Sequence, residues 1–377
     1  MFPVNPFHRV ILLSAFVTGW MLLPLFLSGQ RYNFNHFGIS EGLPQSFVYT
    51  LDQDSLGYLW IGTGEGLARY NGLNFKVYTT QNGLADNFIS ASCYDRSGRL
   101  WVGHYQGGLR RQSNGGFETV LRGQNSSRIN AVLQDKEGRI IVATQHHGLF
   151  LLHSDAKDSS DVQALEAPWL QEQQVYTMAF DLDQKTLLIG TDSGLKRGQI
   201  EGNRLRFTSE VPDLKGQLVN SITVLELGWV AGTRQKGLVC SRVSFGNHPY
   251  LFLNRENGFP ERINFVKKSS DTEVWVGAAD GLYQCDYDLG KGLIIRNYFG
   301  RENGLKDLNI RAFLADREGN FWLGTFGGGL VKFHNDYFNL VEGRNSLSSP
   351  DIHSIYLDND QRLLLGTEMG LSILQFA

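Results

Sequence analysis

The feature that most constrains the fold of this chain is a short phrase, Trp-Ile-Gly-Thr-x-x-Gly-Leu, which recurs eight times with drift. It is spelled GYLWIGTGEGLARYNG at residues 57–72 and GRLWVGHYQGGLRRQSNG at residues 98–115. The residues at its third position are 41, 40, 47, 42, 45, 47 and 42 residues apart: Gly62, Gly103, Ala143, Gly190, Gly232, Gly277, Gly324 and Gly366. Repeats of this length built from short strands predict the blades of a β-propeller.

Each repeat divides into four predicted strands. An apolar run ends at an acidic turn, as in residues 310–319, and is followed by the Trp-Ile-Gly-Thr strand, a Gly-Leu-x-x-Tyr strand and a short aromatic strand such as residues 75–78. Neighbouring blades cover both faces of a blade, and the glycine of the phrase leaves room for a large residue of the next sheet. The recurrent aspartates precede turn glycines, so we expect them to bond turn N–H groups rather than to catalyse: Asp54, Asp95, Asp135, Asp316 and Asp358.

The two ends of the chain decide how many blades close the ring. Residues 32–37 resemble a fourth strand without the first three, and the eighth unit ends with its third strand, at residues 370–377. Joining them completes a blade and removes the exposed edges, so we predict an all-β, closed eight-bladed propeller of four-stranded blades over residues 30–377. The alternative is seven closed blades, ending near Phe333, followed by the first blade of a truncated second propeller.

Residues 1–29 do not share the pattern of the repeats. His8 and Arg9 precede an apolar run over residues 10–27, and Ser28-Gly29 follows it. This pattern predicts a signal peptide or an uncleaved N-terminal anchor, and so a periplasmic or cell-envelope location. The three cysteines are far apart and indicate no disulfide framework. A net charge of −3 without a basic run argues against a nucleic-acid partner.

The repeats resemble a known family. The pattern N-G-L-x-x-N…D-x-x-G-x-L-W-I-G-T-x-x-G-L-x-R-Y is similar to the two-component regulator propeller, most strongly at residues 82–109, 303–330 and 42–70. The resemblance covers residues 32–376 and weakens in the third, fourth and fifth units, where Trp is lost. It implies the periplasmic sensor of a membrane histidine kinase, a class that commonly responds to polysaccharide breakdown products. No kinase domain follows in this sequence, so the resemblance implies a sensor module that is not itself an enzyme.

The loops between the second and third strands vary from repeat to repeat. In a meander blade these loops share a face with the connections between blades, and binding groups belong on loops held by a rigid scaffold. Amides, aromatic rings and both signs of charge suit an oligosaccharide or another small polar ligand. The candidate ligand-binding residues are Glu65, His104, Tyr105, Gln106, Gln145, His146, His147, Asp192, Arg234, Gln235, Lys236, Asp280, Phe326 and Glu368.

Other functions are weighed against this one. His104, His146 and His147 fall in neighbouring repeats, but adjacent loop histidines rarely aim at one point, so we predict no metal site and no cofactor. A secreted glycoside-active enzyme would need two carboxylates facing one ligand. A protein-interaction scaffold would show an apolar patch. We expect an exported ligand-sensing propeller of an envelope signalling system, with a downstream signalling domain or a second protomer as its partner.

Overall fold

The computed structural model describes residues 33–113, 116–122, 127–241, 250–288, 290–334, 347–349, 351–358 and 362–375. The predicted signal or anchor at residues 1–29 lies outside these residues. Among the residues that are described, no helix is long and apolar enough to cross a membrane.

The first four blades are antiparallel four-stranded sheets in chain order. Their strands are β2 (Val48–Gln53), β3 (Leu59–Thr63), β4 (Leu67–Tyr70) and β5 (Phe75–Tyr78); β6 (Ile89–Tyr94), β7 (Leu100–His104), β8 (Leu109–Ser113) and β9 (Gly116–Leu121); β10 (Ile129–Gln134), β11 (Arg139–Thr144), β12 (Leu149–His153) and β13 (Gln163–Ala164); and β14 (Val175–Phe180), β15 (Thr186–Thr191), β16 (Gly194–Glu201) and β17 (Arg204–Glu210).

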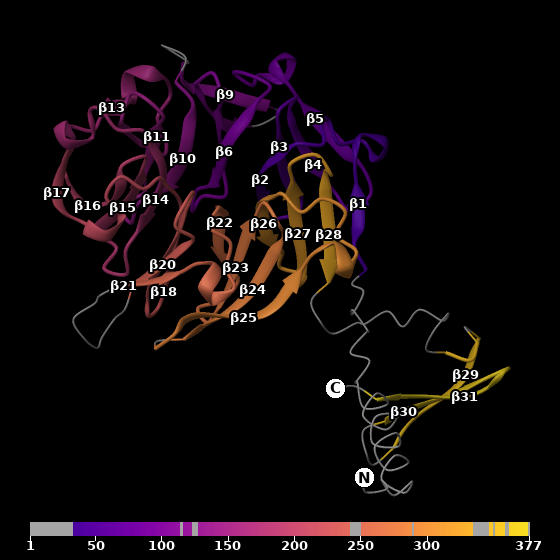
Figure 1. Ribbon diagram of the computed structural model, residues 1–377. Coiled ribbons are helices and arrows are strands. Elements are labelled where there is room, and N and C mark those ends of the chain that lie inside the picture. The colour runs from indigo at the N-terminus through magenta and orange to yellow at the C-terminus, as the bar shows by residue number, and fades with distance from the viewer. Residues whose placement is uncertain are drawn as a thin grey trace, which may run out of the picture.

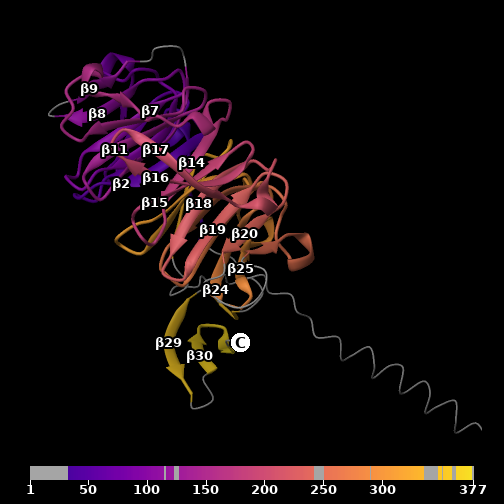
Figure 2. The same cartoon turned by 90° about the vertical axis from the view of Figure 1, so that its left-hand side faces the viewer.

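The remaining strands form two more blades of the same kind, a seventh blade, and a separate three-stranded sheet (Figures 1 and 2). They are β18 (Val219–Leu225), β19 (Gly228–Thr233), β20 (Leu238–Ser241) and β21 (Tyr250–Leu253); β22 (Ile263–Lys268), β23 (Glu273–Ala278), β24 (Leu282–Asp288) and β25 (Gly292–Phe299); β26 (Ile310–Ala315), β27 (Asn320–Thr325) and β28 (Leu330–His334); and β29 (Ile352–Leu357), β30 (Arg362–Thr367) and β31 (Gly370–Gln375).

The N-terminal strand β1 (Asn35–Phe37) closes the ring, as its sequence predicts, but at the seventh blade. It pairs antiparallel with β28, from Asn35 opposite Lys332 to Phe37 opposite Leu330. The propeller of four-stranded blades is therefore confirmed, whereas closure through the eighth unit is wrong. The order β1-β28-β27-β26 is the seven-bladed closure of the alternative.

Packing between the first and seventh blades explains why no eighth blade fits between them. The Phe37 ring lies 5.8 Å from Trp322 of blade seven and 5.4 Å from Tyr70 of blade one. A Cβ on Gly324 would lie 2.5 Å from Val48, the first residue of β2. The two blades are in direct contact, so the gap that an eighth blade would fill does not exist.

The recurrent aspartates hold the turns between the first two strands, as predicted. Asp54 accepts hydrogen bonds from the backbone N–H groups of Leu56 and Tyr58 and from the indole Nε1 of Trp60. Asp95 and Asp316 bond Trp101 and Trp322 in the same way. Each carboxylate therefore fixes a tight turn and orients the tryptophan that fills the space between blades.

The Asn-Gly-Leu phrase shapes the connection from one blade to the next. It forms a short 3₁₀ helix, as at Thr80–Asn82, which ends at Gly83 with a φ of 95°. The side chain of Asn82 accepts the backbone N–H of Thr79, and Leu84 is buried. Glycine tolerates this left-handed conformation without strain, and the leucine anchors the connection to the core.

Candidate functional site

A β-bulge recurs at the start of the first strand of every blade. In β2 the register shifts between Val48 and Thr50, and the same shift follows the first residue of β6, β10, β14, β18, β22 and β26. The residue left out of the ladder is then free to point elsewhere. Because each first strand contacts the first strands of the adjacent blades, these strands surround the axis of the ring. The bulged residues are Tyr49, Ser90, Asn130, Tyr176, Asn220, Asn264 and Arg311.

Four of the bulged residues join one blade to the next. Asn130 Nδ2 donates to the carbonyl of Val175 at 2.7 Å, and Ser90 Oγ donates to the carbonyl of Ile129 at 2.7 Å. Asn220 and Asn264 donate in the same way to Ile263 and Ile310. The other three, Tyr49, Tyr176 and Arg311, make no such bond to another described residue and remain as candidates for binding.

The turns between second and third strands meet the bulges at the same end of the ring. The N–H of Tyr105 donates to the carbonyl of Phe88, and the N–H of Phe326 donates to that of Asn309. The residues that gather at this end are called the mouth below: Tyr49, Phe88, Tyr105, Arg128, Tyr176, Asp192, Arg234, Arg262, Arg311 and Phe326.

Aromatic rings from three blades line one side of the mouth. The Tyr49 ring lies 4.6 Å from Phe88 and 6.4 Å from Phe326, and Phe88 lies 4.7 Å from Tyr105. Tyr105 is 47% exposed and Phe326 is 41% exposed, although both rings belong to a tight network. Exposed aromatic faces held rigidly in place are suited to stack on a sugar ring or another flat ligand.

Four arginines from four blades supply positive charge to the mouth. The Arg128 guanidinium lies 5.4 Å over Tyr105, and that of Arg311 lies 4.8 Å over Phe326. Burial lowers the pKa of both, and the neighbouring charges of Arg262 and Arg234 lower that of Arg311 further. Arg128 and Arg311 belong to blades three and seven, on opposite sides of the ring, yet they interact electrostatically. Both side chains therefore extend toward the axis.

Negative charge at the mouth is scarce. Asp192 interacts with Tyr176, whose pKa is raised mainly by burial and also by that carboxylate. Its Oδ1 is buried and has no hydrogen-bond partner among the described residues. One carboxylate facing four guanidinium groups leaves the mouth with a local excess of positive charge, although the whole chain carries a net charge of −3.

A cavity of about 550 Å³ opens beside the mouth between the fifth and sixth blades. Arg234 and Arg262 contribute to its lining, so it is continuous with the mouth. Tyr283 lies at its wall, and its hydroxyl donates to Asp280 Oδ2 at 3.3 Å. A cavity of this size, with aromatic and charged walls, can hold a ligand of two or three sugar units.

The residues proposed from sequence fall into three groups in the structure. Tyr105, Asp192, Arg234 and Phe326 belong to the mouth, whereas Glu65, Gln106, Gln145, His146, His147, Gln235, Lys236 and Asp280 lie on the turns around it. His104 takes the strand position that is threonine in most repeats; it is fully buried, and burial lowers its pKa to about 4. Glu368 lies in the β29–β31 sheet, 3.6 Å from His353, and so outside the ring.

Six of the ten residues of the mouth were not predicted from the sequence: Tyr49, Phe88, Arg128, Tyr176, Arg262 and Arg311. These residues begin the first strand or immediately precede it, where the apolar pattern masks them. A usable signal was a large polar residue directly after the first β-branched residue of a repeat, as in Val48-Tyr49 and Ile310-Arg311. In the described part of the chain, no group of three or more His, Cys, Asp or Glu side chains could hold a metal ion.

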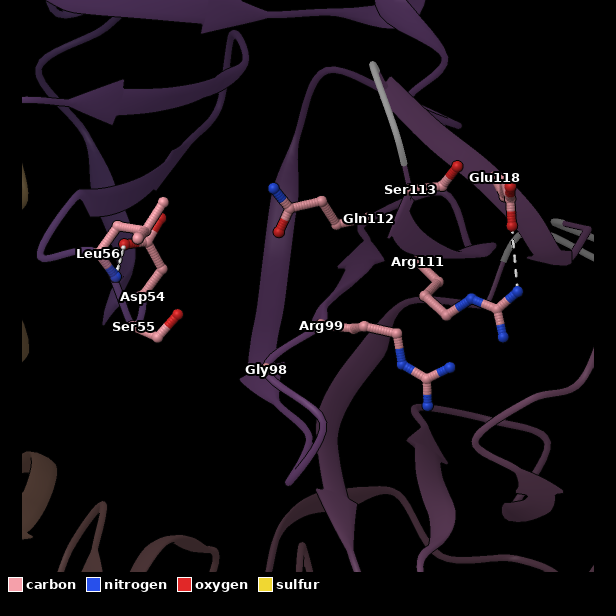
Figure 3. Close-up of a pocket in the computed structure, with 9 residues that line it drawn as sticks. All are labelled: Asp54, Ser55, Leu56, Gly98, Arg99, Arg111, Gln112, Ser113 and Glu118. Atoms are coloured by element: carbon pink, nitrogen blue, oxygen red, sulfur yellow. Dashed lines mark hydrogen bonds and ion pairs between the residues drawn. The ribbon is translucent and has the colours of Figure 1, made fainter.

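A second hollow, of about 430 Å³, lies on the opposite face of the ring (Figure 3). Its charged groups already have partners: Arg111 pairs with Glu118 at 3.0 Å, and Arg99 pairs with Asp95 at 2.8 Å. Asp54 is engaged by its own turn. These groups hold the turns together, so the mouth is the better candidate for a binding site.

Comparison with known proteins agrees with the fold and the repeat. The pattern of the two component regulator propeller family matches residues 42–65, 83–106 and 304–327. Histidine kinase P4 of Formosa agariphila is 28% identical over 155 residues, which are 38% of this chain and 11% of that protein. The chain thus spans about a tenth of the length of this curated relative.

Solved structures share the architecture. The extracellular domain of the hybrid two component system BT3049 from B. thetaiotaomicron superimposes with a TM-score of 0.69 at 21% identity, over 91% of this chain and 48% of that one. Streptogramin B lyase superimposes with a TM-score of 0.63 at 13% identity, over 80% of this chain and 97% of that one. At these identities the likeness shows the fold alone.

Proposed function

Because the chain carries the repeats of the two-component regulator propeller family, we propose that it is the ligand-binding part of an envelope signalling system, with the mouth of the ring as its binding site. The ligand is an oligosaccharide or another small polar molecule. The observation that carries this proposal is the convergence of exposed aromatic rings and unpaired arginines from several blades at one end of the axis.

The chemistry of the mouth supports recognition rather than catalysis. Tyr105 and Phe326 offer rings to stack against, Arg128 and Arg311 offer N–H donors, and Asp192 offers an acceptor. A glycosidase would need two carboxylates facing one ligand, but of the acidic candidate residues Glu368 lies in the β29–β31 sheet and Asp280 accepts a hydrogen bond from Tyr283. The likeness to lyases supports a shared scaffold, not a shared reaction.

Export and a signalling partner complete the proposal. Export is supported by the sequence of residues 1–29 and by the extracellular origin of the BT3049 domain. The partner is a downstream signalling domain or a second protomer. Ligand binding shifts the equilibrium only if the ligand prefers one arrangement of ring and partner, as population-shift arguments require.

The experiment is isothermal titration of the protein with oligosaccharide mixtures prepared from neutral and acidic polysaccharides. The test variant carries Tyr105→Ala, Arg234→Ala and Phe326→Ala together, since these side chains are exposed and support little of the core. We expect it to lose binding without a change in its melting temperature. The same three changes with unaltered affinity would show that the ligand binds elsewhere.

A matched control replaces exposed residues outside the mouth. Leu73→Ala together with Arg206→Ala removes an apolar and a cationic side chain from other surfaces of the ring. This variant should bind as the unaltered protein does. Equal loss in both variants would point to a general effect on folding or surface charge and would remove the support for the mouth.

A further inference from the structure

We propose that the mouth selects an acidic sugar: Arg128 and Arg311 take the carboxylate or sulfate of the ligand, and Tyr105 and Phe326 pack against its ring. The inference rests on the proposed function, because it names the chemical class of ligand for the same site. It separates this protein from a propeller that binds neutral sugars.

The first observation is that the mouth arginines lack acidic partners. Several arginines elsewhere in the ring lie close to carboxylates, as Arg139 does to Asp135 at 2.6 Å and Arg206 to Glu201 at 2.7 Å, although the Nε atoms of Arg110 and Arg197 are buried without a hydrogen-bond partner. Among the described residues, none of the four arginines of the mouth has an ion pair. The Nε atoms of Arg128 and Arg311 are also buried without a hydrogen-bond partner.

The second observation is that aromatic rings hold these guanidinium groups in place, while the described residues accept no hydrogen bond from them. The Arg128 guanidinium lies over the Tyr105 ring, and that of Arg311 lies over the Phe326 ring. A cation–π contact restrains a guanidinium group without using its N–H groups, which can then make a two-pronged contact with a carboxylate or sulfate. An anion bound there would replace the water that burial has removed from both side chains.

The third observation is that gathering these arginines at the mouth costs free energy in the folded protein. The positive charges of Arg262, Arg234 and Arg128 repel that of Arg311, and burial disfavours the charged form of Arg311. Such a cluster of buried positive charge destabilises the folded protein, and a bound anion would offset part of that cost. The cavity beside the mouth has a mixed lining, with Arg234, Arg255 and Arg262 beside the carboxylates of Glu261 and Asp280, so the acidic group of the ligand is assigned to Arg128 and Arg311 and not to this cavity.

The test compares acidic with neutral ligands on the whole protein. The acidic probes are oligogalacturonate, oligoalginate, and chondroitin sulfate and heparin oligosaccharides; the neutral probes are gluco-, xylo- and galacto-oligosaccharides. Inorganic sulfate alone is the probe for a simple anion site. We expect at least one acidic mixture to bind in 20 mM salt, and its affinity to fall several-fold at about 200 mM salt because ion pairs are screened.

Two variants at the mouth and one control variant locate the contact. Arg128→Gln with Arg311→Gln should weaken acidic binding by about a hundredfold, since each charge-assisted contact is worth roughly a factor of ten or more. Arg206→Gln, which removes the same charge from a surface pair, should have no effect. Arg311→Lys keeps the positive charge but removes the paired N–H donors of the guanidinium group. A loss of affinity for the acidic ligand between those of the unaltered protein and the double variant would therefore support two-pronged binding.

The outcomes separate this inference from the proposed function. Binding of neutral mixtures alone would overturn the acidic inference and leave the proposed function standing. Binding of sulfate as tightly as any sugar would overturn the role of the aromatic rings. Absence of binding by every probe would overturn both.

Discussion

The seventh blade and the β29–β31 sheet carry nearly the same repeat but differ in burial. Ile310, Phe313 and Leu323 of the seventh blade are almost completely buried. In β29, all six side chains are exposed, including Ile355 at 66% and Tyr356 at 65%. The phrase therefore specifies a blade locally, whereas burial of that blade depends on having a neighbour on each side.

The glycine of the phrase shows the same contrast. A Cβ on Gly324 would meet Val48 of the next blade, whereas a Cβ on Gly366 would meet only Ser354 of its own sheet. The glycine of the seventh blade is thus required by contact between blades, whereas among the described residues no neighbouring blade contacts Gly366. Changes at equivalent positions of the two regions should have different effects, which makes the contrast measurable.

The largest effect is expected at the closing strand. Phe37→Ala removes the ring that packs between Trp322 and Tyr70. We expect a loss of about 3 kcal/mol in the free energy of unfolding, as for other large-to-small changes at aromatic packing sites. Urea unfolding followed by tryptophan fluorescence measures it, with exposed Leu73→Ala as the control. A loss below about 1 kcal/mol would argue against closure of the ring by β1.

The next largest change in the free energy of unfolding is expected at Gly324, which we compare with Gly366. Gly324→Ala should cost about 2 kcal/mol, because the added methyl group meets the side chains of Val48 and Ala312 at a packed blade interface. Gly366→Ala should cost less than about 0.5 kcal/mol, because the Ser354 hydroxyl can rotate away. The unfolding midpoints of the two variants provide the test. Equal losses would mean that the β29–β31 sheet is as tightly packed as the ring.

Burial inside the ring also predicts a response to pH. The pKa of His104 falls from an unfolded value of 6.5 to about 4. The folded protein then holds this histidine neutral while the unfolded chain binds a proton, so stability is complete above pH 6.5 and is lost as the pH falls toward 4. In equivalent positions Thr144 and Thr233 donate to a turn carbonyl instead.

His104→Thr should therefore reduce the acid sensitivity of the ring. We expect the variant to gain about 1–2 kcal/mol relative to the unaltered protein between pH 7.5 and pH 4.5. Thermal unfolding at the two pH values measures the difference. His353→Thr in the exposed β29 strand is the matched control and should leave the pH dependence unchanged. An identical acid response in all three proteins would show that His104 is not the group responsible.

Much of the fold could be predicted because the features of the repeat depend on residues that are close together in the sequence. The turn carboxylates, the interblade tryptophans and the fourth-strand character of β1 follow from residues a few positions apart. The blade number could not be predicted, because residues 330–332 and 371–373 are both third strands of the same repeat and the sequence does not distinguish them as partners of β1. Packing between the first and seventh blades, which are far apart in the sequence, distinguishes them in the structure. Arg128 and Arg311 were missed for a related reason, since 183 residues separate them in the sequence.

The smallest effect is expected at the exposed face of the β29–β31 sheet. Ile355→Ala should change the free energy of unfolding by less than about 0.5 kcal/mol, because the side chain is already 66% exposed. Urea unfolding provides the measurement. A loss above about 1 kcal/mol would mean that a partner covers this face in solution. Sedimentation then distinguishes a second protomer, for which the loss depends on protein concentration, from the ring of the same chain, for which it does not.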